Sequence, residues 1–203
     1  MKAILLMMLT AVCYSAASAQ WVPRPFIPPP PGPLETFLDS NPNATVVKKQ
    51  TGILVGSNQE KAVFIAVVAS SPADPTVKFK GIEIQITDTG HTRTLYLDYE
   101  PAVRPDSRDN FQHFLIRLAF CEDTNAITVQ VHEQNPAATR YGANTDAFAH
   151  NRVAFDIGWW HTEEDTGVMI IGPRGRHFVY LPGTSISQAM ESIKAAREFL
   201  IAN

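Results

Sequence analysis

The sequence predicts an α+β protein with a mostly antiparallel β-sheet, one internal helix and a C-terminal amphipathic helix packed on the sheet. Several segments within residues 45–181 alternate apolar and polar side chains with the period of two that strands have, and turn residues separate them. Two other segments carry apolar residues at the spacing of a helix. Runs of strands with helices in separate places are typical of the α+β class.

The first 19 residues predict a secretory signal and not a part of the folded domain. Lys2 precedes a short apolar stretch, and Ala17 and Ala19 place small side chains where signal peptidase reads. The stretch is too short for a membrane span, and no later stretch reaches the roughly 18 apolar residues that a span needs. We therefore expect a secreted or periplasmic protein that is cleaved near Ala19 and has no membrane span.

Charge and cysteine content limit the partners and the means of stabilisation. The chain has 17 basic and 20 acidic side chains, a net charge of −3, which argues against nucleic acid as the partner. Cleavage near Ala19 would remove Cys13 and leave only Cys121, so no internal disulfide is expected. The acidic neighbours Glu122 and Asp123 disfavour a thiolate at Cys121, which favours a packed small hydrophobe.

Residues 20–44 predict a Pro-rich extended segment, which precedes a single α+β domain over residues 45–203. The stretch 21–33 is rich in proline, which favours the polyproline II conformation and a semi-rigid spacer or strap. Arg24 is its one cation, whereas antimicrobial peptides of this kind need many. A further hypothesis makes this segment a bioactive peptide that is released, with the rest of the chain as its carrier.

Four segments between residues 45 and 99 predict strands. These segments are 45–55, 61–69, 77–86 and 93–99. In the third segment, Ile82, Ile84 and Ile86 share one face, and Leu95 and Leu97 do the same in the fourth. The last two segments therefore predict a hairpin with one buried face.

The rest of the chain predicts two helices and further strands. Apolar residues at helical spacing, with Ser107 as the N-cap, predict a helix over 107–118. Ser185 and Gln188 form a capping-box pattern at the start of the closing helix. The apolar stripe of that helix comprises Ile186, Met190, Ile193, Ala196 and Leu200. The predicted strands are 126–133, 152–160, 168–172 and 176–181, with a polar loop over 135–144.

The tripeptide Asp-Thr-Gly occurs twice, beginning at Asp88 and at Asp165, and resembles the catalytic motif of the aspartic proteases. Such an enzyme needs two carboxylates that share one proton. His91 stands where that motif has a small residue, and Glu164 stands where the second copy needs an apolar strand residue. We therefore interpret both copies as hairpin turns, in which Asp accepts hydrogen bonds and Gly supplies a positive φ.

Other chemistry has little support in the sequence. The six histidines are scattered, with no His-Glu-x-x-His motif and no cysteine pair, so neither a metal site nor a cofactor is expected. A secreted hydrolase would have to assemble an acid–base pair from Asp88 and His91, or from Asp156 and His161. No motif places a nucleophile, a base and an orienting group at a recognisable spacing. We expect a protein that is not an enzyme, with such a hydrolase as the alternative.

Aromatic and basic residues near the end of the chain predict a binding surface. Trp159 continues the apolar face of its strand, so Trp160 points the other way and His161 follows it. The next tight turn carries Arg174, Arg176 and His177. Tryptophan and arginine together suit a partner that bears carboxylate or phosphate. The sequence thus predicts an exported binding protein of the inhibitor, immunity or envelope-accessory kind, which acts through its β-sheet surface on a protein or a small anionic ligand.

Overall fold

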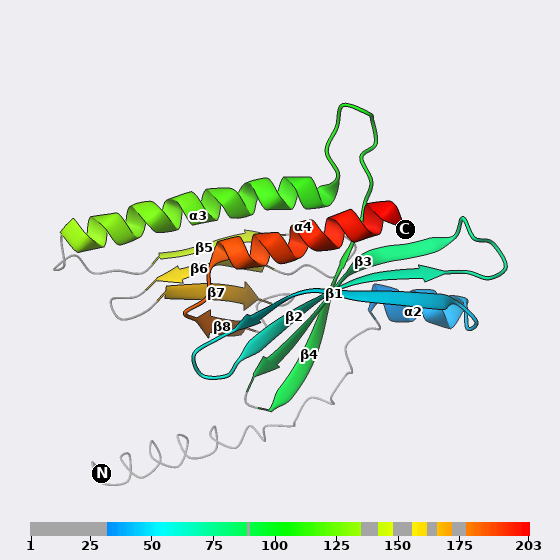
Figure 1. Cartoon of the computed structure of the whole chain (residues 1–203), viewed down its shortest axis with the longest axis horizontal. Helices are drawn as coiled ribbons and strands as arrows, with labels where there is room; N and C mark the ends of the chain where they lie inside the picture. Colours follow the sequence, from blue (N-terminus) through cyan, green and yellow to red (C-terminus); the bar gives the residue numbers. More distant parts are fainter. Residues whose placement is uncertain (1–31, 89, 135–141, 148–155, 162–165, 172–177) are drawn as a thin grey trace, which may run out of the picture. The chain divides into compact units, whose positions relative to one another are not determined.

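The computed structural model describes residues 32–88, 90–134, 142–147, 156–161, 166–171 and 178–203, which contain two antiparallel sheets and three helices (Figure 1). The first sheet has the order β1 (Thr45–Val55), β2 (Lys61–Ser70), β3 (Lys78–Asp88) and β4 (His91–Asp98). The second has the order β5 (Gly142–Ala147), β6 (Asp156–His161), β7 (Thr166–Ile171) and β8 (Phe178–Pro182). The helices are α2 (Pro33–Ser40), α3 (Asn110–Gln134) and α4 (Ile186–Ala202). The predicted α+β class is confirmed.

The first sheet is a meander in which each strand pairs with the next along the chain. Ile82 lies opposite Leu97 and Ile84 opposite Leu95, and all four side chains are buried. The predicted hairpin and its buried face are therefore confirmed. The alternation works because successive side chains of a strand point to opposite faces of the sheet.

Helix α4 packs on β1 and β2 of the first sheet and also contacts α3, while α3 packs on β5 and β6 of the second sheet (Figure 1). Four residues of the predicted stripe of α4 are buried, namely Ile186, Ile193, Ala196 and Leu200. These residues belong to one hydrophobic cluster that includes side chains of both sheets, among them Ile84 and Trp159. A single apolar core thus joins the two sheets through the helices.

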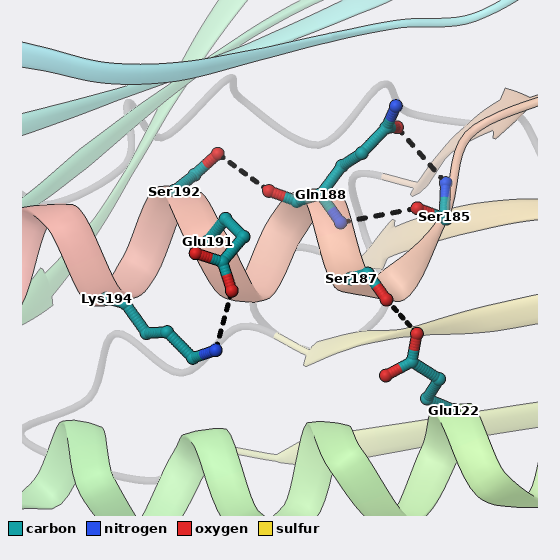
Figure 2. Close-up of polar contacts among 7 residues, drawn as sticks. All are labelled: Glu122, Ser185, Ser187, Gln188, Glu191, Ser192 and Lys194. Carbon is teal, nitrogen blue, oxygen red and sulfur yellow. Dashed lines mark hydrogen bonds and ion pairs between the residues drawn. The ribbon is translucent and has the colours of Figure 1, made fainter.

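The start of α4 has the predicted capping box. The Ser185 hydroxyl accepts a hydrogen bond from the Gln188 amide, and the Gln188 side chain accepts one from the Ser185 amide (Figure 2). These bonds satisfy amide groups that the first turn of a helix leaves without intrahelical partners. The Ser187 hydroxyl donates to the Glu122 carboxylate of α3, as Figure 2 also shows, so the two helices are joined at this end by a polar contact.

The predicted extended segment 20–44 is wrong over residues 33–40, which form α2, whereas residues 20–31 lie outside the described part of the chain. Pro33 occupies the first helical position, where its fixed φ and missing amide hydrogen are tolerated. The Glu35 carboxylate accepts a hydrogen bond from the Gly32 amide at 2.8 Å. Leu34 packs against Val67 on the face of the first sheet that is turned away from α4, and so holds the helix there.

Two further sequence predictions are wrong. Residues 126–133, predicted as a strand, continue α3, and residues 142–144, predicted as loop, begin β5. No Gly or Pro interrupts α3, and its early residues Phe111, Phe114 and Leu118 are anchored in the core. Propagating a nucleated helix adds one hydrogen bond per residue, which outweighs propensity differences of about 0.7 kcal/mol or less. Strand β5 has no apolar alternation of its own and is defined by its pairing with β6.

Candidate functional site

The first Asp-Thr-Gly copy is a hairpin turn, as predicted. Asp88, the last residue of β3, pairs with His91, the first residue of β4, and Gly90 between them has φ +85°. Residues that have a side chain rarely adopt this left-handed backbone conformation, whereas glycine adopts it without strain. Asp88 is half-buried and His91 is exposed, so this pair of hypothetical catalytic residues lies at the tip of a hairpin.

The second copy is built differently. Asp165 lies outside the described residues, but Thr166 and Gly167 are the first two residues of β7, and Gly167 pairs with both Trp160 and Pro182. A Cβ atom on Gly167 would lie 2.3 Å from the Leu181 carbonyl oxygen. Gly167 therefore allows the backbones of β7 and β8 to approach each other closely. The prediction that it supplies a positive φ is wrong.

The other hypothetical catalytic pair is spread along one strand. Asp156 is the first residue of β6 and His161 is the last. At about 3.3 Å per residue, their Cα atoms are separated by roughly 16 Å. A proton cannot pass directly between side chains at that separation, because direct transfer needs a hydrogen bond of about 3 Å.

The structure describes only two of the predicted binding residues. Trp160 and His161 lie at the end of β6 that pairs with Gly167 and Thr166. Arg174, Arg176 and His177 lie outside the described residues, in the connection whose flanking residues Ile171 and Phe178 are paired with each other. Ile171 also pairs with Asp156, so Ile171 and Phe178 lie at the end of the sheet opposite Trp160. The combined surface stays a prediction, whereas the predicted burial of Trp159 is confirmed.

Glu83 of β3 is a buried carboxylate whose partners are structural. Its side chain is 4% exposed and accepts a hydrogen bond from the Lys48 ammonium at 2.6 Å and one from the Gln85 amide at 2.6 Å. Burial, together with the nearby carboxylates of Glu83 and Glu35, raises the pKa of Tyr96 to about 12. The phenol of Tyr96 is therefore neutral at physiological pH. The Lys48 ammonium compensates the buried charge of Glu83, and this ion pair links β1 to β3 across β2.

Asp109 is the second buried carboxylate, and it organises the start of α3. Its Oδ1 accepts the Gln112 amide at 2.9 Å, and the Gln112 side chain accepts the Asp109 amide at 3.0 Å. Its Oδ2 lies 2.7 Å from the Arg197 guanidinium of α4, a hydrogen bond that raises the pKa of Arg197. Asp109 therefore caps α3, and the prediction that Ser107 does so is wrong.

The chain makes an exposed excursion between β4 and α3, and residues 101–108 are all exposed. We call these residues the β4–α3 loop; it is the green loop that extends beyond the start of α3 in Figure 1. Asn110 closes the base of the loop. Its side-chain oxygen accepts the Glu100 amide at 3.0 Å, its own amide donates to the Glu100 carbonyl at 3.3 Å, and its side-chain nitrogen donates to the Asp98 carbonyl at 2.7 Å.

The tip of the loop is also ordered by hydrogen bonds. The Ser107 amide and hydroxyl both donate to the Arg104 carbonyl, at 3.0 and 2.8 Å, and the Arg104 amide donates back to the Ser107 hydroxyl at 2.9 Å. Pro105 occupies the second position of this turn, where its fixed φ is favourable. Val103 precedes the turn and is 94% exposed. The sequence signal for this turn is the Arg-Pro-Asp-Ser stretch, of which the sequence analysis uses only Ser107, as the predicted cap of a helix.

Two features of the described residues concern metal binding and membrane crossing. Among them, no group of three His, Cys, Asp or Glu side chains is placed to hold a metal ion. None of the helices in the same ranges combines the length and the apolar character that crossing a membrane requires. Cys121 is buried in the core, as the sequence predicts for a packed small hydrophobe.

Comparison of the chain with protein-family models, with curated proteins and with solved structures finds no match.

Proposed function

We propose that this chain is an exported, non-enzymatic protein that binds another protein, and that the β4–α3 loop is its contact surface. The observation that carries the proposal is the hydrogen-bonded closure between Glu100 and Asn110. The chain returns to the same place after the intervening residues, so the connection between β4 and α3 does not need them. Loops whose ends meet in this way are frequently functional.

The order within the loop supports the same proposal. Fixing one residue's backbone costs about 1–2 kcal/mol in conformational entropy, and residues 101–108 bury little of themselves in return. Pro101, Pro105 and the Arg104–Ser107 turn lower that cost, because they restrict the chain before any partner arrives. A loop that is ordered in advance and exposed loses little further entropy on binding.

The first test asks whether the loop is dispensable for folding. Replacing Ala102–Arg108 by Gly-Gly, with Asp109 and Asn110 kept, should change the free energy of unfolding by less than about 1 kcal/mol. Urea denaturation followed by circular dichroism measures this change. A much larger loss would mean that the loop holds the fold together, which removes the reason for assigning it a binding role.

The second test asks whether the loop binds. A photoreactive benzoylphenylalanine replaces Ala102 in the full chain, and Ala73, exposed in the β2–β3 connection, serves as the matched control position. We expect a crosslinked protein from extracts of the producing cells at position 102 and not at 73. Excess unlabelled chain should suppress it, whereas the Gly-Gly chain should not. Equal crosslinking at both positions, or equal competition by both chains, would refute the proposal.

A further inference from the structure

We infer that the partner of the β4–α3 loop presents an apolar pocket with carboxylates on its rim. This inference rests on the proposed binding role and specifies the chemistry of the partner. It follows from three features of the loop, namely the side chain of Val103, the guanidiniums of Arg104 and Arg108, and the turn that brings them together.

Val103 is the apolar element. At 94% exposure it is the most exposed large hydrophobic side chain among the described residues; the next, Phe120, is 66% exposed. A single exposed valine is ordinary on a flexible surface. Here it precedes a turn closed by three hydrogen bonds, so its position relative to the turn is constrained. An apolar side chain presented in this way fits a pocket on a partner.

The turn places the two arginines beside this valine. The hydrogen bond from the Ser107 amide to the Arg104 carbonyl reverses the chain, so Val103 and Arg108 stand on neighbouring limbs of the turn. Within the ranges that the structure describes, neither Arg104 nor Arg108 has a carboxylate at ion-pair distance, whereas Arg197 is engaged by Asp109. Both loop guanidiniums are therefore available to carboxylates of another molecule, which they can bind through paired hydrogen bonds.

The charge of the loop differs in sign from that of the chain. The loop carries Arg104 and Arg108 against Asp106, two positive charges and one negative, or +1, while the whole chain carries −3. The basic loop attracts acidic surfaces locally. The net negative charge of the whole chain disfavours general adhesion to polyanions. Two cations around a valine are too few to favour nucleic acid or an anionic membrane as the partner. The partner class that fits the loop is therefore a protein.

The test uses the chain with benzoylphenylalanine at position 102 and four variants of it. The yield of the crosslink at position 102 should fall about tenfold or more in Arg104→Glu/Arg108→Glu. It should fall by a similar factor in the parent chain when NaCl is raised from 50 mM to 500 mM. Arg104→Lys/Arg108→Lys keeps the charge and should retain most of it. Val103→Asp should abolish it, whereas Val77→Asp, at a site that is 44% exposed outside the loop, should not. Mass spectrometry of the crosslinked product should find a protein segment that contains Asp or Glu.

The outcomes separate this inference from the proposed function. A loop-specific crosslink that survives both charge reversal and high salt would overturn the acidic rim and leave the binding role standing. Attachment to lipid or nucleic acid would overturn the inference, and with it the proposal of a protein partner. The lack of any crosslink specific to position 102 would overturn both.

Discussion

The two glycines of the Asp-Thr-Gly copies should respond in opposite ways to the same substitution. In Gly167→Ala, the added Cβ would lie 2.3 Å from the Leu181 carbonyl oxygen and 2.8 Å from the Pro182 Cα atom. Both are backbone atoms, so no side-chain rotation can relieve the contact. In Gly90→Ala, nothing lies within 4 Å of the added Cβ, and the only penalty is the backbone φ of +85°.

The magnitudes follow from this geometry. An ordinary contact begins near 3.4 Å, so β7 and β8 would have to separate by about 1 Å around Gly167, which would strain their hydrogen bonds. We expect Gly167→Ala to lower the free energy of unfolding by about 3 kcal/mol, the upper range for overpacking. The left-handed backbone makes Gly90→Ala cost about 1 kcal/mol. Asn tolerates that backbone, so Gly90→Asn should lie closer to the parent chain.

Urea denaturation of the three variants and the parent protein measures these differences. Thermal melting of Gly167→Ala should show a midpoint lower by about 6–12 °C for a domain of this size. Asn at position 167 should be at least as harmful as Ala, because the obstacle there is space. The reasoning would fail if Gly167→Ala lay within 1 kcal/mol of the parent chain, or if Gly90→Ala were the more damaging change.

Three other predictions concern the remaining polar groups. Asp109→Ala removes the cap of α3 and leaves Arg197 without its partner, so the free energy of unfolding should fall by about 3 kcal/mol. Asp109→Asn can still cap the helix and should lose less stability. Equal losses of the two variants in urea denaturation would contradict this reasoning. Because the folded pKa of Tyr96 is raised to about 12, stability that depends on its neutral phenol is complete below about pH 10 and is lost as the pH rises toward 12. Denaturation at pH 9 and pH 11.5 should reveal that loss, and Tyr96→Phe should reduce it; an unchanged pH dependence would count against the shift. If the surface that the sequence predicts also binds the partner, Trp160→Ala and Arg174→Ala should each weaken partner capture without unfolding the domain; unchanged capture in both would contradict that prediction and leave the β4–α3 loop as the contact surface.

Local patterns in the sequence account for the parts of the fold that were predicted correctly. Ile82 and Ile84 face Leu97 and Leu95 because period-two alternation and a glycine turn act between near neighbours in the chain. The Ser185 capping box and the apolar stripe of α4 are equally local. Such signals survive folding, since the contacts they describe lie within one hairpin or one helix.

Tertiary structure decided the points on which the sequence prediction was wrong. Residues 126–133 have a strand-like composition, yet they continue a helix whose beginning is anchored in the core by Phe111 and Phe114. The sequence predicts that Gly167 is a turn residue. In the structure, the register of β7 and β8 places the Leu181 carbonyl beside it. Propensity is a weak preference, and packing overrides it at these positions.

The candidate loop illustrates the same division. The Arg-Pro-Asp-Ser stretch at 104–107 favours a turn locally, because Pro, Asp and Ser act on their own backbone, but the sequence analysis uses only Ser107 and takes it for a helix cap. Only the tertiary structure decided that Asn110 closes the base of the loop and that Asp109, held by Arg197, begins the helix. Asp109 and Arg197 are 88 residues apart. Contacts of that range depend on how whole elements pack, which no local pattern encodes.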